Sequence, residues 1–146
     1  MTDKRNGQTP IESIMSTNVC HLPETATVAD AARSMRDRQV GDILVTDSRG
    51  KITGIVTDRD IVVRAVAEDE APAATKLGDI CSRDVSFVSP DQPMQDVVGL
   101  MVERSIRRVP VVEEGKPVGI LSLGDLAERG DPSSVLGQLS GAPPNN

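Results

Sequence analysis

Residues 54–60 read Gly-Ile-Val-Thr-Asp-Arg-Asp, and residues 119–125 read Gly-Ile-Leu-Ser-Leu-Gly-Asp. Each stretch has a glycine, two apolar residues, a hydroxyl residue, two variable positions and an aspartate. The pattern predicts a strand that runs into a helix, because the hydroxyl side chain can cap the first turn of that helix. The same junction stands twice in one chain, which indicates that the chain repeats a folding unit.

The repeat extends well beyond these two junctions. A shift of 66 residues aligns the first copy with the second, and the shift falls to 65 after the turn that joins the last two predicted strands. Aligned pairs include Ile14 with Ile80, Met35 with Met101, Val45 with Val111, and Asp60 with Asp125. Matches that keep their order over this length predict two tandem copies of one βαββα-type unit, a mixed α/β (α+β) fold.

Each copy is predicted to contain a short apolar turn, an extended segment, a helix, two strands joined by a turn, and a closing helix. The first helix is expected to begin at Thr27, with Asp30 completing a capping box, and its counterpart to carry Pro93 in its first turn. Pro110 is expected at a strand start or on an edge. In the first copy, the turn is predicted at residues 11–15, the extended segment around Val19, the strands at 42–46 and 52–56, and the closing helix at 58–67. In the second copy, the turn is predicted at residues 77–81, the extended segment around Val85, the strands at 109–112 and 118–121, and the closing helix at 123–129.

Composition divides the chain into five parts. The two copies are predicted at residues 10–67 and 76–130, and a polar linker at residues 68–75 is expected to separate them. Residues 1–9 are polar and are predicted to be a disordered N-terminus. Residues 131–146 are rich in Ser, Gly, Pro and Asn and are predicted to form a flexible tail.

The overall composition argues against several classes of function. The formal net charge is −6, which disfavours nucleic acid as the main partner, because such binding needs Lys and Arg to neutralise phosphates. Phe87 is the one aromatic residue, so the core must be aliphatic and a bound base would lie between aliphatic walls. No apolar stretch is long enough to span a bilayer and no signal-peptide core begins the chain, so we expect a cytoplasmic protein with no membrane partner.

Catalytic and metal-binding chemistry finds no support in the sequence. Cys20 and Cys81 lie far apart and, with His21 as the one histidine, offer no recognised zinc spacing. We interpret both cysteines as buried or half-buried thiols and His21 as an ordinary surface or edge residue. The chain shows no Ser/His/Asp set, no pair of catalytic carboxylates and no P-loop, so we expect no enzyme, no metal and no cofactor.

The aspartates of the two junctions admit two interpretations. Asp60 and Asp125 each follow the hydroxyl residue by three positions, so each carboxylate can bond back to the cap and serve the helix alone. Alternatively, each carboxylate accepts both hydroxyls of a ribose, while the hydroxyl of Thr57 or Ser122 reaches the ribose or a phosphate. The presence of the pattern in both copies favours the second interpretation.

Two arginines precede a predicted strand in the second copy. Arg107 and Arg108 are either a solvated strand end or a phosphate clamp, since guanidinium groups match phosphate geometry. The first copy has Val-Gly-Asp at residues 40–42, and Asp42 would repel phosphate. Arg59 could compensate in the first copy, whereas the second copy has Gly124 at that position.

Taken together, these segments resemble the cystathionine-β-synthase (CBS) domain family. The resemblance rests on residues 14–16, 40–45, 54–61, 107–112 and 119–122, covers about residues 9–129, and is closest in kind to stand-alone bacterial CBS-pair proteins of the hypoxic response type. It implies a tandem pair of CBS domains with pseudo-twofold symmetry. It also implies that clefts between the two domains bind AMP, ADP, ATP, S-adenosylmethionine or related ligands.

The resemblance further implies roles for single residues and for partners. For the sugar and phosphate, it implies ribose binding by Asp60 and Asp125, and ribose or phosphate contact by Thr57 and Ser122. For the base, it implies adenine contact by the backbone near Val19 and Val85, with apolar walls from Ile43 and Val109. It also implies a phosphate contact from Arg107 and Arg108 near Asp60. A homodimer that pairs through its helices is implied as well, and an unidentified protein partner would read the ligand state.

Two functions of different classes remain open on this basis. The first is a regulatory, ligand-sensing module that binds adenosine-containing nucleotides between its two CBS domains and changes shape when it does so. The second is a structural or protein-interaction dimer whose clefts are vestigial and unoccupied.

Overall fold

The computed structural model describes residues 10–129 of the 146-residue chain. The predicted disordered N-terminus and flexible tail lie outside the described residues. The chain divides into two compact units, and neither unit is one continuous repeat. We call residues 19–85 the first-repeat unit, and residues 10–18 together with 86–129 the second-repeat unit. Each unit therefore joins the body of one repeat to the opening segment of the other, and each is described by itself.

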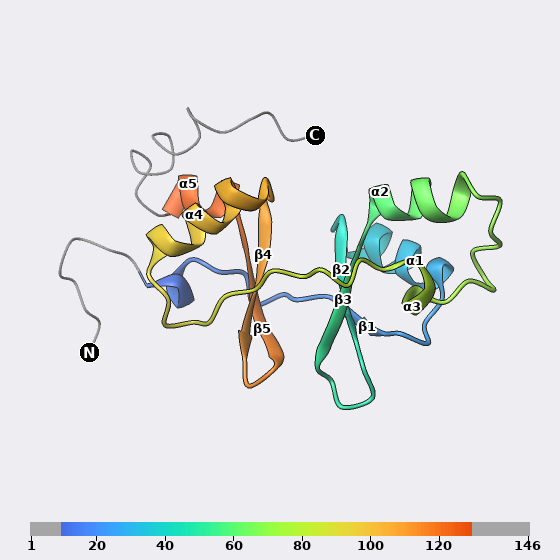
Figure 1. Ribbon diagram of the computed structural model, residues 1–146, viewed down its shortest axis with the longest axis horizontal. Coiled ribbons are helices and arrows are strands. Elements are labelled where there is room, and N and C mark those ends of the chain that lie inside the picture. Colours follow the sequence, from blue (N-terminus) through green and yellow to red (C-terminus); the bar gives the residue numbers. More distant parts are fainter. Residues whose placement is uncertain (1–9, 130–146) are drawn as a thin grey trace. The chain divides into compact units, whose positions relative to one another are not determined.

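The first-repeat unit is built on a three-stranded sheet in the order β1-β2-β3 (Figure 1). β1 runs parallel to β2, and β2 is antiparallel to β3, so Asp42 lies opposite Thr57 at one end of the hairpin. The elements are β1 (His21–Pro23), α1 (Val28–Arg38), β2 (Asp42–Thr46), β3 (Ile52–Thr57), α2 (Asp58–Ile61), η3 (Val62–Val66) and α3 (Leu77–Ile80). The predicted order of strands and helices is confirmed here, although β1 begins two residues after Val19.

The second-repeat unit contains an antiparallel hairpin of two strands, and Arg108 lies opposite Ser122 in its register. Its elements are η2 (Ile11–Ser13), α4 (Met94–Arg104), β4 (Arg108–Glu113), β5 (Lys116–Ser122) and α5 (Leu123–Arg129). The segment around Val85, predicted to be extended, forms no named strand among the described residues. Val88 alone contacts the hairpin there, through a parallel bridge to Val111.

Local chemistry explains where the two long helices begin and end. Thr27 caps α1 in a complete capping box, since its hydroxyl accepts from Asp30 N at 3.1 Å and Asp30 Oδ2 accepts from Thr27 N at 2.9 Å. Pro93 is the N-cap of α4, one position before the first turn in which it was predicted. Both helices end in a left-handed residue, Gln39 or Ser105, with φ near 55°.

Three sequence predictions need correction or refinement. The closing helix of the first repeat divides into α2 and the wider π-helical turn η3, in which Ala67 N donates to Val62 O at 2.9 Å. Pro110 is the third residue of β4 and not at its start, and it lies on an edge strand of the two-stranded sheet, which is the second of its two predicted positions; its carbonyl accepts from Val88 N. The predicted linker is bound to α1, because Thr75 O accepts from Val28 N at 2.9 Å.

Each unit has an aliphatic core, as the composition predicts. Phe87 is 55% exposed and belongs to neither core. The core of the first-repeat unit consists of Cys20, Val28, Ala31, Ile43, Val45, Val56, Ala65, Leu77, Ile80 and Cys81. The core of the second-repeat unit consists of Ile11, Ile14, Val88, Met94, Val97, Val98, Met101, Val109, Val111, Leu121 and Leu126. No helix within residues 10–129 is long and apolar enough to cross a membrane.

The opening segments of the two repeats pack in the same way on opposite sheets. We call residues 10–18 the first leading segment and residues 77–85 the second leading segment. Ser16 exchanges two backbone hydrogen bonds with Ile120 of β5, each 2.9 Å long, and Ser82 exchanges two of the same length with Ile55 of β3. Each leading segment thus covers the free edge of the other repeat's hairpin, which protects that edge from further pairing.

Candidate functional site

The strand-to-helix junction of the first-repeat unit is a closed hydrogen-bonded turn. Thr57 is the last residue of β3 and caps α2: its hydroxyl accepts from Asp60 N at 3.1 Å, and Asp60 Oδ2 accepts from Thr57 N at 2.9 Å. Asp58 N donates to Gly41 O at 2.9 Å. This last bond ties the start of α2 to the residue that precedes β2, so residues 41–42 and 57–60 form one group.

The second-repeat unit repeats this arrangement with different side chains. Ser122 Oγ accepts from Asp125 N at 3.0 Å, and Asp125 Oδ2 accepts from Ser122 N at 3.2 Å. Leu123 N donates to Arg107 O at 2.7 Å, which is the counterpart of the bond between Asp58 and Gly41. Four residues that were separate candidates in the sequence come together at one end of the β4–β5 hairpin: Arg107, Arg108, Ser122 and Asp125.

The capping interpretation of the two aspartates is confirmed by these bonds. Capping uses one oxygen of each carboxylate, and an ionised carboxylate offers about four acceptor positions. The other oxygen of Asp60 lies 3.9 Å from Nε of Arg64, and the Asp60 side chain is 19% exposed. Acceptor capacity is left at each junction, so the cap and a sugar contact are compatible. Ribose binding by Asp60 and Asp125 stays a prediction.

The two junctions carry opposite charge at equivalent places. Asp42 stands beside the capped turn of the first-repeat unit, whereas Arg108 stands at the corresponding place in the second-repeat unit. Arg59, Arg107 and Arg108 are exposed. Because Arg107 and Asp60 belong to different units, the phosphate contact that would join them remains a prediction, and so does the compensating role of Arg59.

The residues expected to meet the base occupy two kinds of position. Ile43 and Val109 are buried in the cores of their own units, and a wall role for them stays a prediction. Val19 and Val85 are half-buried residues at the two ends of the first-repeat unit. The Val19 carbonyl accepts from Arg38 Nη1 at 3.5 Å, the long limit for such a bond.

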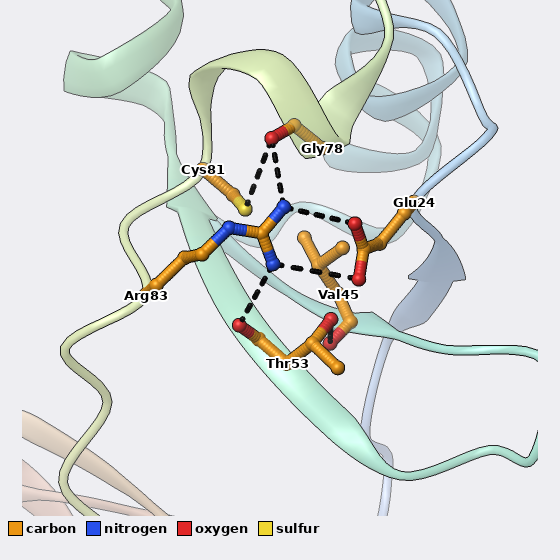
Figure 2. A network of polar contacts seen from close by, with 6 residues as sticks. All are labelled: Glu24, Val45, Thr53, Gly78, Cys81 and Arg83. Atoms are coloured by element: carbon orange, nitrogen blue, oxygen red, sulfur yellow. Dashed lines mark hydrogen bonds and ion pairs between the residues drawn. The ribbon is translucent and has the colours of Figure 1, made fainter.

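A polar network around Arg83 was not predicted from the sequence. Figure 2 shows the Arg83 guanidinium facing the Glu24 carboxylate, with Nη2 at 2.9 Å from Oε1 and Nη1 at 3.4 Å from Oε2. The same guanidinium donates to Gly78 O at 3.0 Å and to Thr53 O at 3.4 Å. We call these four residues the Arg83 clamp. It fastens the second leading segment to β3 and to the residue after β1.

No local signal could have revealed this clamp, because Glu24 and Arg83 are far apart in sequence and belong to no motif. The hydrogen bonds from Arg83 hold the pKa of the Glu24 carboxyl below its ordinary value, and they raise the pKa of Arg83. Beside the clamp, burial raises the pKa of the Cys81 thiol above its ordinary value, so that thiol stays neutral. Residue 83 is half-exposed, so the clamp acts mainly through geometry rather than through a large electrostatic free energy.

Within residues 10–129, no three His, Cys, Asp or Glu side chains stand close enough together to hold a metal ion. Cys20 and Cys81 are buried free thiols in the core of the first-repeat unit.

Comparison with known proteins assigns the repeat to a family. The family model described as "CBS domain" matches twice, at residues 11–66 and at residues 77–130. The chain belongs to the CBS domain family. It is thus a CBS domain pair, as the sequence resemblance implied, with the capped strand-to-helix junction present once in each domain.

Two curated relatives contain this pair in chains of different length. Hypoxic response protein 1 from Mycobacterium tuberculosis is 30% identical over 119 residues, which cover 82% of this chain and 83% of that protein. CBS domain-containing protein CBSCBSPB3 from Arabidopsis thaliana is 34% identical over 118 residues, which cover 81% of this chain. The match covers only 21% of the Arabidopsis protein, so there the pair is a small part of a longer chain.

Solved structures with the same fold differ in what they hold and how they assemble. Hypoxic Response Protein I, described with two coordinated zinc ions, matches with a TM-score of 0.76 and 30% identity over 83% of this chain and 98% of that one. The CBS domain pair of protein MJ0100, in complex with 5′-methylthioadenosine and S-adenosyl-L-methionine, matches with a TM-score of 0.73 and 25% identity, over 83% and 94% of the two chains. A hexameric CBS-CP12 protein from bloom-forming cyanobacteria matches with a TM-score of 0.74 and 28% identity, over 85% and 69%.

Proposed function

We propose that this CBS domain pair is a regulatory module that binds an adenosine-containing ligand at its two capped junctions. Candidate ligands are AMP, ADP, ATP and S-adenosylmethionine. The observation that carries the proposal is the duplicated pair of a hydroxyl and a carboxylate, Thr57 with Asp60 and Ser122 with Asp125, each held rigid by its capping box. The complex of the MJ0100 pair with two adenosine derivatives supports the choice of ligand class.

The chemistry of such a site follows from the capped turn. A carboxylate that is already fixed by a backbone hydrogen bond loses little conformational entropy when it accepts a hydroxyl of the sugar. In the second-repeat unit, the Arg107 guanidinium adds a group that can bind phosphate. A ligand that binds one conformation more tightly than another shifts the population toward that conformation, which is how a module without catalytic groups regulates a partner.

Isothermal titration calorimetry with each of the four ligands tests this proposal. We expect saturable heat with at least one ligand, and about a tenfold or greater loss of affinity in Asp60→Asn, in Asp125→Asn, or in both. Arg107→Gln is expected to weaken ATP more than S-adenosylmethionine, since only ATP carries phosphates. An absence of heat with all four ligands, together with an unchanged melting temperature, would contradict the proposal.

The α1 capping box supplies the matched control. Asp30 makes the same two cap bonds with Thr27 but is at the start of α1 and not at a strand-to-helix junction. Asp30→Asn therefore reports the cost of weakening a cap without removing a candidate ribose contact. An affinity that falls equally in Asp30→Asn and Asp60→Asn would show that the loss comes from general destabilisation.

One specific observation favours the second candidate function, an interaction module that pairs with its own copy. Val62, Val63 and Val66 on the closing helix of the first-repeat unit are 58%, 48% and 58% exposed. Arg59 lies before these valines, and the acidic residues 68–70 lie after them. Two copies that pair antiparallel about a twofold axis would bring Arg59 of one copy toward the acidic run of the other. Self-assembly is supported by the CBS-CP12 neighbour, which is hexameric.

Native mass spectrometry of the full chain tests this second function. Val62→Glu is expected to convert a dimer to a monomer, because it places a charge in the centre of the valine face. Ser48→Glu, an equally charged change on the exposed hairpin turn, should leave the assembly intact. A monomeric wild-type chain, or a dimer that survives Val62→Glu, would contradict pairing through this face.

A further inference from the structure

Both leading segments place a sulfur atom on a glycine of the sheet they cover. A Cβ at Gly119 would clash with Sδ of Met15 and would lie 2.8 Å from its Cγ, so the thioether rests directly on the bare backbone of β5. In the first-repeat unit, a Cβ at Gly54 would lie 2.6 Å from Sγ of Cys81. Gly119 and Gly54 occupy equivalent positions in the repeat, and each of them leaves room for the sulfur.

Met15 stands between the two anchors of the first leading segment. On one side, Ile11 and Ile14 are buried in the core of the second-repeat unit. On the other side, Ser16 and Ile120 exchange two backbone hydrogen bonds. A change of volume or polarity at the Met15 sulfur therefore acts at the centre of the contact that holds this segment in place.

The two sulfurs differ in how well an oxidant can reach and attack them. Met15 is half-buried, unlike Met94 and Met101, which are 4% and 2% exposed in the same unit. A thioether reacts with peroxide without prior deprotonation, whereas a thiol reacts as its thiolate. Cys81 is buried and held as the neutral thiol, so the second leading segment lacks a comparable reactive group.

We infer that Met15 is a peroxide-sensitive latch, whose oxidation releases the first leading segment from the β4–β5 hairpin. In the reaction, hydrogen peroxide transfers one oxygen atom to the sulfur. The O–O bond breaks, an S–O bond forms, the thioether is oxidised to the sulfoxide, and peroxide is reduced to water. The added oxygen makes the side chain larger and more polar, at a thioether that already rests on the backbone of Gly119.

This inference is independent of ligand binding, because it uses none of the capping residues. Its direct consequence is local opening of the second-repeat unit at Ser16 and Ile120, while the first-repeat unit stays closed. The two leading segments, alike in backbone geometry, thereby acquire different sensitivity to oxidants.

Hydrogen peroxide titration of the full chain, followed by peptide mass spectrometry and amide hydrogen exchange, tests the latch. We expect one oxygen atom on Met15 before any on Met94 or Met101. After that oxidation, the amides of Ser16 and Ile120 should exchange about tenfold faster or more, while those of Ile55 and Ser82 keep their rates. The inference is overturned if Met15 oxidises no faster than Met101, or if the Met15 sulfoxide leaves the exchange of Ser16 and Ile120 unchanged.

Two variants separate oxidation of Met15 from oxidation elsewhere. Met15→Leu conserves volume and removes the sulfur, so peroxide should no longer accelerate exchange at Ile120. Met35→Leu removes the other partly buried methionine of the described residues and should leave the response intact. Met15→Gln introduces a polar group without peroxide and should accelerate exchange at Ile120 by itself. A peroxide response that persists in Met15→Leu would assign the effect to another residue.

Discussion

The two units contain copies of the same repeat, yet different side chains hold the equivalent backbone contact in each of them. The first-repeat unit holds the second leading segment with the Ser82–Ile55 bonds and adds the Arg83 clamp, which joins that segment to Glu24 and Thr53. The second-repeat unit holds the first leading segment with the Ser16–Ile120 bonds, the isoleucine anchors and the Met15 thioether. Duplication thus preserved the backbone contact, while the side chains around it diverged.

The charge at the junctions diverged in the same manner. Asp42 stands where the second repeat has Arg108, although both positions pair with the hydroxyl residue of the cap. Backbone hydrogen bonds at the junction depend on the main chain and a short polar cap, so they tolerate this change. A negatively charged ligand would be repelled by Asp42 and attracted by Arg108. We therefore propose that the two junctions differ in their preference for phosphate.

The largest expected effect comes from a cavity created under each leading segment, and it tests which hairpin that segment stabilises. Ile14→Ala and Ile80→Ala each remove a buried side chain, and each should lower the free energy of unfolding by about 2–5 kcal/mol. Ile14→Ala should accelerate amide exchange in β4 and β5, and Ile80→Ala should do so in β2 and β3. These patterns follow from the exchange of leading segments between repeats.

Milder variants provide the control for the isoleucine cavities. Ile14→Val and Ile80→Val should give the same exchange patterns with a loss of about 1 kcal/mol. If Ile14→Ala opened β2 and β3 instead, the assignment of the first leading segment to the second-repeat unit would be wrong.

A medium effect is expected from filling the two glycine positions. Gly54→Ala brings a Cβ within 2.6 Å of Sγ of Cys81 and within 2.9 Å of the Ser82 carbonyl oxygen. The backbone at Ser82 would have to shift to relieve this contact, which destabilises the fold. The three atoms nearest to a Cβ at Gly119 all belong to the flexible Met15 side chain. Chemical denaturation should therefore show a loss of about 2–3 kcal/mol for Gly54→Ala and a smaller loss for Gly119→Ala. Equal losses would mean that the two sulfur contacts are equally rigid.

The smallest effect is the pH dependence of the Arg83 clamp. Because the folded state lowers the pKa of Glu24, its carboxylate stabilises the fold above the ordinary pKa of glutamate, and that stabilisation is lost as the pH falls through the lowered value. The melting temperature of Glu24→Gln should thus lie slightly below that of the wild type at pH 7, and the difference should shrink toward pH 3.

An exposed ion pair on a single helix is the control for the pH experiment. Asp37 pairs with its neighbour Arg36 at 2.8 Å, and that hydrogen bond also lowers the pKa of Asp37. The pair joins adjacent residues and closes no distant contact, so Asp37→Asn should change the melting temperature less than Glu24→Gln at pH 7. A larger change in melting temperature for Asp37→Asn than for Glu24→Gln would contradict a stabilising role of the clamp.

Sequence reasoning succeeded where the deciding interactions are local. Thr27 with Asp30 and Thr57 with Asp60 are three residues apart, so the residue types alone predict the cap and its position. The strand at residues 42–46 has the predicted bounds, since its β-branched run is flanked by turn residues on both sides. The extended segment predicted around Val85 forms no strand of its own, because a strand requires a partner and the residues around it form only isolated bridges, at Ser82 and Val88.

The amino-acid sequence by itself determined that the chain contains two CBS-type repeats, where each capped junction stands, and that the cores are aliphatic, because these properties depend on residue type and short spacing. Only the tertiary structure decided which hairpin each leading segment covers. Residues 11–16 and 77–82 carry similar apolar patterns and suit either sheet, so the local pattern cannot choose between them. The same holds for the Arg83 clamp, whose members come together only when the chain brings distant segments into contact.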